Sequence, residues 1–337
     1  MKQIELILGT MTFGESVFSP DVGKFINIFL DAGYIQLDTA YVYNEGQCEK
    51  LLGEVLPDIE KPYKIATKVN PRISGRLDAE AAYAQMKGSL ERLNISCVDI
   101  LYLHFPDPAT PVENVLEACE NLYEQGKFKE LGLSNFPAWM VSDIWHKCDK
   151  KGWIKPTVYE GIYNPLTRKA EIELNACLDN FGMRFYAYNP LAGGLLSGRY
   201  HSFAAFPSEG RFTHRPNYQR RYWKKSYFDS VEMLHTVCEK QKIALAEAAY
   251  RWLACHSMLN RERGDAIIIG ASKPEHLRRN ILAAEAGALP ADIVNAFEEA
   301  WNICKADCPE YFTLYNSTGT VGGKKERYHV KSEIGSR

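Results

Sequence analysis

The chain has 337 residues, and 46% of them are hydrophobic, which is enough to bury a sizeable core. Its 40 basic and 42 acidic residues leave a formal net charge of −2, so the charge gives no reason to expect a nucleic-acid partner. Nine dispersed cysteines, a start without a secretory leader and the lack of an apolar run near 18 residues predict a cytoplasmic protein that does not enter a membrane.

Short apolar runs alternate with stretches of helical period along most of the chain. Eight runs read as strands, and they begin near residues 5, 34, 63, 98, 131, 157, 184 and 266. Helical patterns lie between them: FINIFLDAG, EKLLGEVL, EAAYAQMKGSLERL, PVENVLEACENLYEQG, WMVSDIWHKC, EIELNACLDNFG and LAEAAYRWLACH. Strands that are apolar almost throughout predict a parallel sheet buried on both faces.

The number of strands favours a closed barrel over an open sheet. The rival fold, a doubly wound sheet, should carry GxGxxG after its first strand, and ILGTMTFGES lacks that motif. The predicted fold class is therefore α/β, a single (β/α)8 TIM barrel. We expect the barrel to span residues 1–312.

Two regions interrupt the alternation of strands and helices. Residues 199–225 form a long aromatic and basic loop after the seventh strand, and its aromatic content favours an ordered active-site loop. Residues 313–337, rich in Gly, Ser, Lys and Thr, are expected to form a flexible tail. Only Cys304 and Cys308 lie close together, with no second pair, so no metal site is expected.

Polar residues follow the strands at the ends where a parallel barrel carries its chemistry. Asp38, Lys68 and His104 follow the second, third and fourth strands, and Tyr43 comes five residues after Asp38. Adjacent strands lie about 4.8 Å apart, so these four side chains are expected to converge. The later strands end on further polar residues: Ser134, Asn135, Glu160, Tyr188, Asn189, Ser272 and Lys273.

The first four residues suit one kind of chemistry. A tyrosine phenol has a pKa near 10 in water and is a poor acid at neutral pH, but an adjacent lysine ammonium favours the phenolate and lowers that pKa. A carboxylate can hold the lysine, and a histidine can hydrogen-bond a substrate oxygen. Such a set can protonate an oxyanion as it forms, as in carbonyl reduction.

Each residue also has an ordinary structural reading when taken alone. Asp38 could cap a turn, Lys68 could be half of an ion pair, His104 could be a core histidine, and Tyr43 could simply pack. A barrel aldolase or hydrolase with Lys68 as a Schiff-base nucleophile is a more remote alternative. The joint placement on successive strand ends favours the catalytic reading.

Several motifs, in order, resemble the aldo-keto reductase superfamily: LDTAYVYNEG, IATK, LYLHFPD, GLSN, YNPLAGGLLSGRY and IGAS. The resemblance covers about residues 4–312 and is strongest to the aflatoxin B1 aldehyde (succinic semialdehyde) reductase branch. It implies NADPH-dependent reduction of an aldehyde or ketone to the alcohol. By the same resemblance Tyr43 is the general acid, tuned by Lys68 and Asp38, and His104 orients the carbonyl.

The resemblance also implies an NADPH (NADP+) cofactor bound across the barrel mouth. Ser134 and Asn135 would hold the carboxamide beside Glu160, Tyr188 would stack on the nicotinamide, and the segment from Asn189 to Arg199 would wrap the pyrophosphate. Lys273 with Arg278 and Arg279 would favour a 2′-phosphate, although the arginines could equally lie on a solvated helix face. The full predicted cofactor set is Ser134, Asn135, Glu160, Tyr188, Asn189, Leu191, Gly193, Arg199, Arg211, Ser272, Lys273 and Asn280.

His104, Tyr218 and Arg221 are the predicted substrate-binding residues, the last two from the long loop. Arg221 could pair with a substrate carboxylate, since a guanidinium matches its geometry, but a charged surface position explains it nearly as well. The chain departs from the family pattern at two positions: Glu160 stands where glutamine is usual, and Thr313 stands where the branch has an arginine. These departures leave room for a bulkier or less acidic substrate.

The expected partner is a small carbonyl compound, and the resemblance implies a possible homodimer. The alternative function is that of a cofactor-binding regulatory subunit of the same fold with little turnover. It would bind NADPH and assemble with a membrane partner, but the intact set of four residues favours the enzyme.

Overall fold

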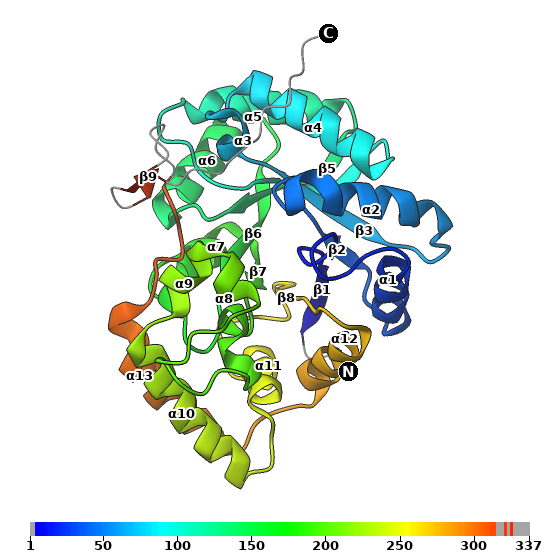
Figure 1. Ribbon diagram of the computed structural model, residues 1–337. Coiled ribbons are helices and arrows are strands. Elements are labelled where there is room, and N and C mark those ends of the chain that lie inside the picture. The colour runs from blue at the N-terminus through cyan, green and yellow to red at the C-terminus, as the bar shows by residue number, and fades with distance from the viewer. Residues whose placement is uncertain (1–3, 315–319, 322–323, 326–337) are drawn as a thin grey trace.

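Eight parallel strands close into a barrel, and helices surround it (Figure 1). The computed structural model describes residues 4–314, 320–321 and 324–325. The barrel strands are β1 (Glu5–Gly9), β2 (Gln36–Asp38), β3 (Lys64–Val69), β4 (Val98–Leu103), β5 (Phe128–Ser134), β6 (Pro156–Ile162), β7 (Arg184–Tyr188) and β8 (Ala266–Ile269). Each strand pairs with the next, and β8 pairs with β1, for example Ile7 with Ile268. The predicted TIM barrel is confirmed.

The apolar strands are buried on both faces because successive side chains point in opposite directions. Leu6 and Leu8 of β1 belong to the large core between strands and helices, whereas Ile7 belongs to a second cluster inside the barrel. That inner cluster takes one or two residues from most strands: Ile7, Ala66, Ile100, Tyr102, Val158, Tyr186, Ala266 and Ile268. It fills the barrel below the ends of the strands, where the polar residues begin.

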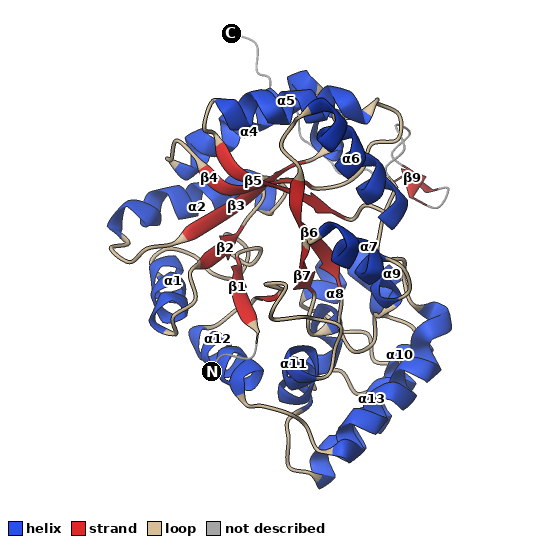
Figure 2. Cartoon of the chain, turned by 180° about the vertical axis from the view of Figure 1, so that it is seen from behind, coloured by secondary structure: helices blue, strands red, loops and turns tan. Residues whose placement is uncertain are grey.

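Helices pack around the outside of the barrel, as the view from behind also shows (Figure 2). They are α1 (Asp21–Asp31), α2 (Gln47–Val55), α3 (Pro71–Ser74), α4 (Ala79–Leu93), α5 (Val112–Glu124), α6 (Ala138–Lys151), α7 (Leu174–Phe181), α8 (Arg211–His214), α9 (Pro216–Tyr222), α10 (Lys225–Lys240), α11 (Leu245–Cys255), α12 (Pro274–Glu285) and α13 (Ala291–Cys304). Local signals set their ends: Asp78 accepts a hydrogen bond from the backbone of Ala81 and caps α4, and Gly152 ends α6 with a φ of 71°.

Some predicted boundaries are shifted. β5 begins at Phe128 rather than near residue 131, and α7 begins at Leu174 after a separate 3₁₀ turn at Lys169–Glu171. The sequence pattern did not predict the helices α10, α12 and α13. α10 and α13 lie side by side, joined by a 2.9 Å hydrogen bond from Ser230 Oγ to the carbonyl of Ala300.

The long segment after β7 is ordered, and part of it is helical. It contains α8 and α9, and its aromatic rings pack on one another: Phe212 lies 5.1 Å from both Tyr200 and Trp223, measured between ring centroids. Of the predicted 313–337 tail, residues 315–319, 322–323 and 326–337 lie outside the described part. The short strands β9 (Thr320–Val321) and β10 (Lys324–Lys325) pair antiparallel, so the expected flexibility of the tail stays a prediction.

Candidate active site

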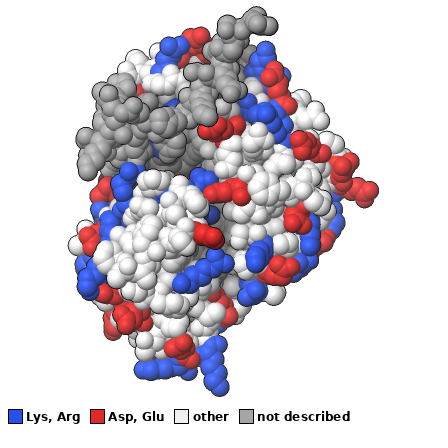
Figure 3. Space-filling model, viewed as in Figure 1, with Lys and Arg blue, Asp and Glu red and all other residues white. Residues whose placement is uncertain are grey.

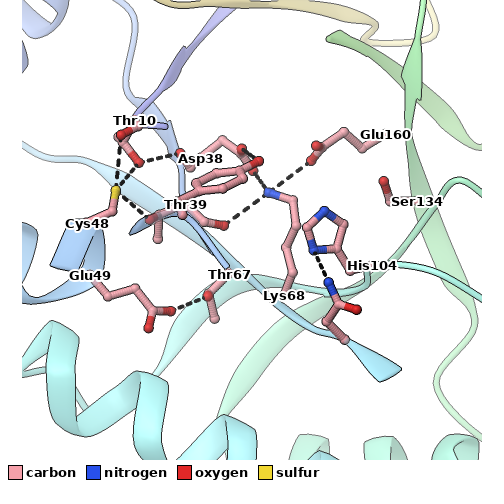
Figure 4. Close-up of polar contacts among 12 residues, drawn as sticks. Thr10, Asp38, Thr39, Cys48, Glu49, Thr67, Lys68, His104, Ser134 and Glu160 are labelled. Carbon is pink, nitrogen blue, oxygen red and sulfur yellow. Dashed lines mark hydrogen bonds and ion pairs between the residues drawn. The ribbon is translucent and has the colours of Figure 1, made fainter. Parts of the chain in front are cut away.

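The polar residues at the carboxyl ends of the strands converge over the barrel core (Figure 4). Asp38 ends β2, Lys68 is one residue from the end of β3, and His104 follows β4 directly. All three are buried, with exposed fractions of 3%, 1% and 7%. The predicted convergence is present in the structure.

Lys68 lies at the centre of this cluster. Its Nζ forms an ion pair with Asp38 and donates a 3.0 Å hydrogen bond to the carbonyl of Thr39. It also lies 3.3 Å from Glu160 Oε2 on β6. Burial by itself lowers the pKa of Lys68, but the two carboxylates more than offset this and raise it above its ordinary value. The lysine is therefore held as an ammonium.

Tyr43 lies above Lys68. Its hydroxyl is 3.5 Å from Asp38 Oδ2, and Lys68 Nζ is 5.3 Å from the centre of its ring. Burial raises the pKa of the phenol well above 10, and the charges of Asp38 and Glu160 raise it further. The pKa of Tyr43 is therefore raised, and not lowered as expected from the neighbouring Lys68, and burial of the phenol is the largest cause. Tyr43 holds its proton at neutral pH.

Two hydrogen bonds from Asn44 hold the loop that carries Tyr43. Asn44 Nδ2 donates to the backbone carbonyls of Met11 and Phe13, at 3.2 and 2.7 Å. Asn44 and Glu45 both have φ values in the left-handed region, at 53° and 54°, which costs free energy and needs such support. Gly46 follows with a φ of 84°, and a Cβ there would lie 3.0 Å from the side chain of Arg92. Gly46 is thus required by conformation and by space.

A buried carboxylate lies under the same loop. Glu49 of α2 is fully buried and accepts a 2.6 Å hydrogen bond from Thr67 of β3 and a 2.7 Å hydrogen bond from Arg92 of α4. The three side chains join α2, β3 and α4 beneath the site. Together with the Asn44 contacts, they hold the Tyr43 loop against the strands.

His104 has a defined orientation. Asn70 Nδ2 lies 3.2 Å from its Nδ1, and because an amide nitrogen donates, Nδ1 accepts and the proton is on Nε2. Burial lowers the pKa of His104 well below its ordinary value, and the charges of Lys68 and Arg72 lower it further. The imidazole is neutral and can offer its Nε2–H to a ligand.

Asn135 connects β5 to β7 through side-chain hydrogen bonds. Its Nδ2 donates to the carbonyl of His104 and to Ser134 Oγ, both at 2.9 Å, and its Oδ1 accepts from the hydroxyl of Tyr188 at 2.7 Å. Thr313, which replaces the expected arginine, donates its backbone N–H to the carbonyl of Asn135 at 3.1 Å. The chain that follows the last helix therefore contacts the site at the end of β5.

The segment after β7 passes close to the aromatic loop. Gly193 and Gly194 have φ values of 71° and 109°, and a Cβ on Gly193 would lie 2.8 Å from the ring of Tyr218. The Leu191 carbonyl accepts the Gly194 N–H at 2.8 Å and tightens the turn. Within the described residues, Asn189 Nδ2 and Ser197 Oγ are buried without a hydrogen-bond partner. This segment has both the close backbone packing and the unused polar atoms of a ligand-binding turn.

Positive side chains gather around His276 of α12. Burial lowers the pKa of this histidine, and the charges of Arg199, Arg279 and Lys273 lower it further. The three cations therefore lie near one another, although Arg199 comes from the Gly-rich segment. Ser272 is exposed beside them, and Asn280 Nδ2 donates to the carbonyl of Gly270 at 3.1 Å.

Both predicted arginines of the long loop lie against Tyr218. The guanidinium carbons of Arg211 and Arg221 are 5.1 and 5.9 Å from the centre of its ring. The Tyr218 hydroxyl donates to Asn189 Oδ1 at 3.2 Å. The loop is thereby joined to the end of β7, within the site region.

Sequence reasoning did not single out Asn70, Thr39 or Glu49. Asn70 sits directly after β3 and before Pro71, and such a strand-end polar residue could have been added to the set by the rule that found Lys68. Thr39 acts through its backbone, which no sequence pattern marks. Glu49 lies on a helix and gives no signal of being buried.

At the carboxyl end of the closed parallel barrel a partly buried tyrosine lies beside a buried lysine, a buried aspartate and a neutral histidine, an arrangement that is chemically suited to proton transfer to a bound ligand. Comparison with known proteins is more specific: the Aldo/keto reductase family matches residues 5–302, and the chain belongs to this family. It is therefore of the oxidoreductase class.

Individual relatives extend the likeness over nearly the whole chain. The chain is 42% identical over 318 residues to aflatoxin B1 aldehyde reductase member 2 of Rattus norvegicus, covering 91% of this chain and 87% of the relative. It is 42% identical over 322 residues to the protein of the same name in Homo sapiens, covering 92% and 90%. An aldo-keto reductase of Pseudocercospora fijiensis is 36% identical over 290 residues, covering 83% and 97%.

Three further observations concern the rest of the molecule. Among the described residues, no helix combines the length and apolar character needed to cross a membrane, and no three metal-ligating side chains gather together. On the face shown in Figure 3, positive and negative side chains are interspersed, so that face carries no large area of one sign.

Proposed function

We propose that the protein reduces an aldehyde or ketone to the alcohol with NADPH, and that Tyr43 is the proton donor. The observation that carries the proposal is the partly buried Tyr43 next to the buried Lys68 and Asp38, beside a neutral His104. Membership of the family and the names of the aldehyde-reductase relatives support the reaction class.

The roles of the side chains follow from their protonation. Nε2–H of His104 donates to the carbonyl oxygen and orients it. Tyr43 keeps its proton until negative charge develops on that oxygen, and then transfers it. Lys68 stabilises the phenolate that remains, and Asp38 holds the lysine in place. A bound nicotinamide cofactor supplies a hydride to the carbonyl carbon, and hydride plus proton complete the alcohol.

The described residues fit such a cofactor. The unpartnered buried atoms of Asn189 and Ser197 would serve the pyrophosphate, and the cations near His276 would serve a 2′-phosphate. Ser134 and Asn135 would hold the carboxamide, and the half-buried ring of Tyr188 would stack on the nicotinamide. The homodimer implied by the resemblance and the cytoplasmic location predicted from the sequence both stay predictions.

The direct test is NADPH oxidation with a panel of aldehydes and ketones, beginning with 4-nitrobenzaldehyde, and with NADH in parallel. We expect turnover with NADPH and tight binding measured by cofactor fluorescence. Binding without turnover across the panel would overturn the enzymatic proposal and favour the regulatory alternative.

The Gly-rich turn gives a test of the cofactor position. We expect Gly193→Ala to raise the Kd for NADPH at least about tenfold, because its Cβ would collide with Tyr218 in addition to the strain of a positive φ. Gly152→Ala is the matched control, since Gly152 at the end of α6 has the same φ of 71° but open space around it. Equal fluorescence titrations for the two variants would contradict the placement.

Cofactor preference should depend on the cations near His276. Replacing Lys273 and Arg279 together by alanine is expected to weaken NADPH binding about tenfold and leave NADH binding unchanged, because only NADPH carries the 2′-phosphate. Lys87→Ala, which removes an exposed cation from α4, is the control. The Kd values for NADPH and for NADH are measured side by side. An equal rise in both would contradict the assignment of these cations to the 2′-phosphate.

A further inference from the structure

Lys68 contacts two buried carboxylates, whereas the proposed proton transfer uses only one. Asp38 comes from β2, and Glu160 comes from β6 (Figure 4). The side chain of Lys68 is 0% exposed, and those of Asp38 and Glu160 are 4% exposed. Water is thus excluded from a group of three ionisable side chains.

The contact with Glu160 differs from the contact with Asp38. Glu160 Oε2 is 3.3 Å from Lys68 Nζ, which is an ion-pair distance and is longer than the contact between Lys68 and Asp38. Asp38 has both the ion pair and the hydrogen bond. Glu160 is therefore the partner that Lys68 holds less firmly.

The charges of this group do not balance when all three residues are ionised. Two carboxylates and one ammonium leave one uncompensated negative charge in a buried site, which is costly. Burial, followed by repulsion from Asp38, raises the pKa of Glu160 to about 8, although Lys68 lowers it. A proton on Glu160 at neutral pH removes the excess charge.

Protonation also changes what Glu160 can offer a ligand. A neutral carboxyl group has one O–H donor and a carbonyl acceptor, so it matches the donor and acceptor set of a glutamine amide. The ionised form only accepts. The glutamate at this position can therefore serve a carboxamide as glutamine would, but only while it keeps its proton.

Other titratable groups of the site lie within electrostatic reach of Glu160. Its charge raises the pKa of three phenols, on β4, on β7 and above the barrel. The three phenols are those of Tyr102, Tyr188 and Tyr43. The charged partners of Glu160 on β2 and β3 are Asp38 and Lys68. Ionising Glu160 therefore makes the phenolate of Tyr43 harder to form.

We propose that Glu160 is a positioning residue that acts through Lys68 by holding a proton during reduction. While Glu160 is neutral, the Lys68 ammonium serves Asp38 and the phenolate of Tyr43. Once Glu160 is ionised, it competes for the ammonium and adds negative charge beside the phenol. The inference rests on the proposed reduction. It predicts that the reduction is slower at alkaline pH, where Glu160 is ionised.

The pH dependence of kcat between pH 6 and 10 tests this role. We expect kcat of the unmodified protein to fall about threefold to tenfold around an apparent pKa near 8. His104, Lys68 and Tyr43 have pKa values shifted away from this range. Glu160→Gln should remove the fall, and Glu117→Gln, an exposed glutamate on α5, should keep it. The same fall in Glu160→Gln would overturn the proposal.

A second measurement does not need turnover. Infrared difference spectra between pH 6.5 and 9.5 should show the carbonyl band of a protonated carboxylic acid that disappears at high pH, and Glu160→Gln should lack this band. If the unmodified protein shows this band but reduces no carbonyl compound, the proposed reduction is wrong and the protonation of Glu160 still stands. An unchanged band in Glu160→Gln would reject the proton-holding role whatever the activity.

Discussion

Tyr43→Phe is expected to lower kcat for NADPH-dependent reduction by about 10²–10⁴-fold, the range that a general acid contributes. The substitution removes only the hydroxyl, which contacts Asp38 at 3.5 Å, and keeps the ring over Lys68. NADPH binding, measured by fluorescence, should change less than about twofold, since the loss concerns proton transfer alone.

Tyr41→Phe is the matched control, because it makes the same change two residues earlier on the same loop. The Tyr41 ring lies 4.6 Å from the guanidinium of Arg92, and phenylalanine keeps this contact. Its kcat should stay within about twofold of the unmodified protein. A Tyr43→Phe protein that retained a tenth or more of the activity would rule out Tyr43 as the proton donor.

Lys68→Met is expected to lower the free energy of unfolding by about 3–5 kcal/mol and to abolish reduction. The lysine is buried between Asp38 and Glu160, and its removal leaves the buried carboxylate of Asp38 without a cation. Urea denaturation measures the stability, and NADPH oxidation measures the activity. The double variant Lys68→Met with Asp38→Asn should recover part of the stability and none of the activity.

The stability loss should depend on pH in a defined direction. Since the pKa of Glu160 is raised to about 8, above about 4.3 in the unfolded chain, its stabilising contribution is complete below the unfolded value and is lost as pH rises through 8. Lys68 lowers the pKa of Glu160, so removing it extends this loss to higher pH. The deficit of Lys68→Met should therefore be larger at pH 8 than at pH 6, and a smaller deficit at pH 8 would contradict this account.

The tertiary structure changed the electrostatic interpretation of the site. The sequence suggested that Lys68 lowers the pKa of Tyr43, but burial of the phenol raises it in the folded protein. The structure also places Glu160 of β6 beside the lysine of β3. These strands are not neighbours, so their side chains meet only across the barrel interior. Likewise, Arg199 and Lys273 come from distant segments, and only the folded chain brings both near His276.

The sequence by itself determined the barrel and the positions of Asp38, Tyr43, Lys68 and His104. Apolar strands that alternate with helices predict a parallel sheet, and the count of eight without GxGxxG favours a closed barrel over an open sheet. The carboxyl ends of parallel strands meet at one edge, so the order of residues along the chain is enough to place these four side chains there. Only the tertiary structure decided which nitrogen of His104 carries the proton, through Asn70, and which charges surround Lys68. Those properties depend on distances between side chains of separate elements and on the exclusion of water, and neither is written in a local pattern.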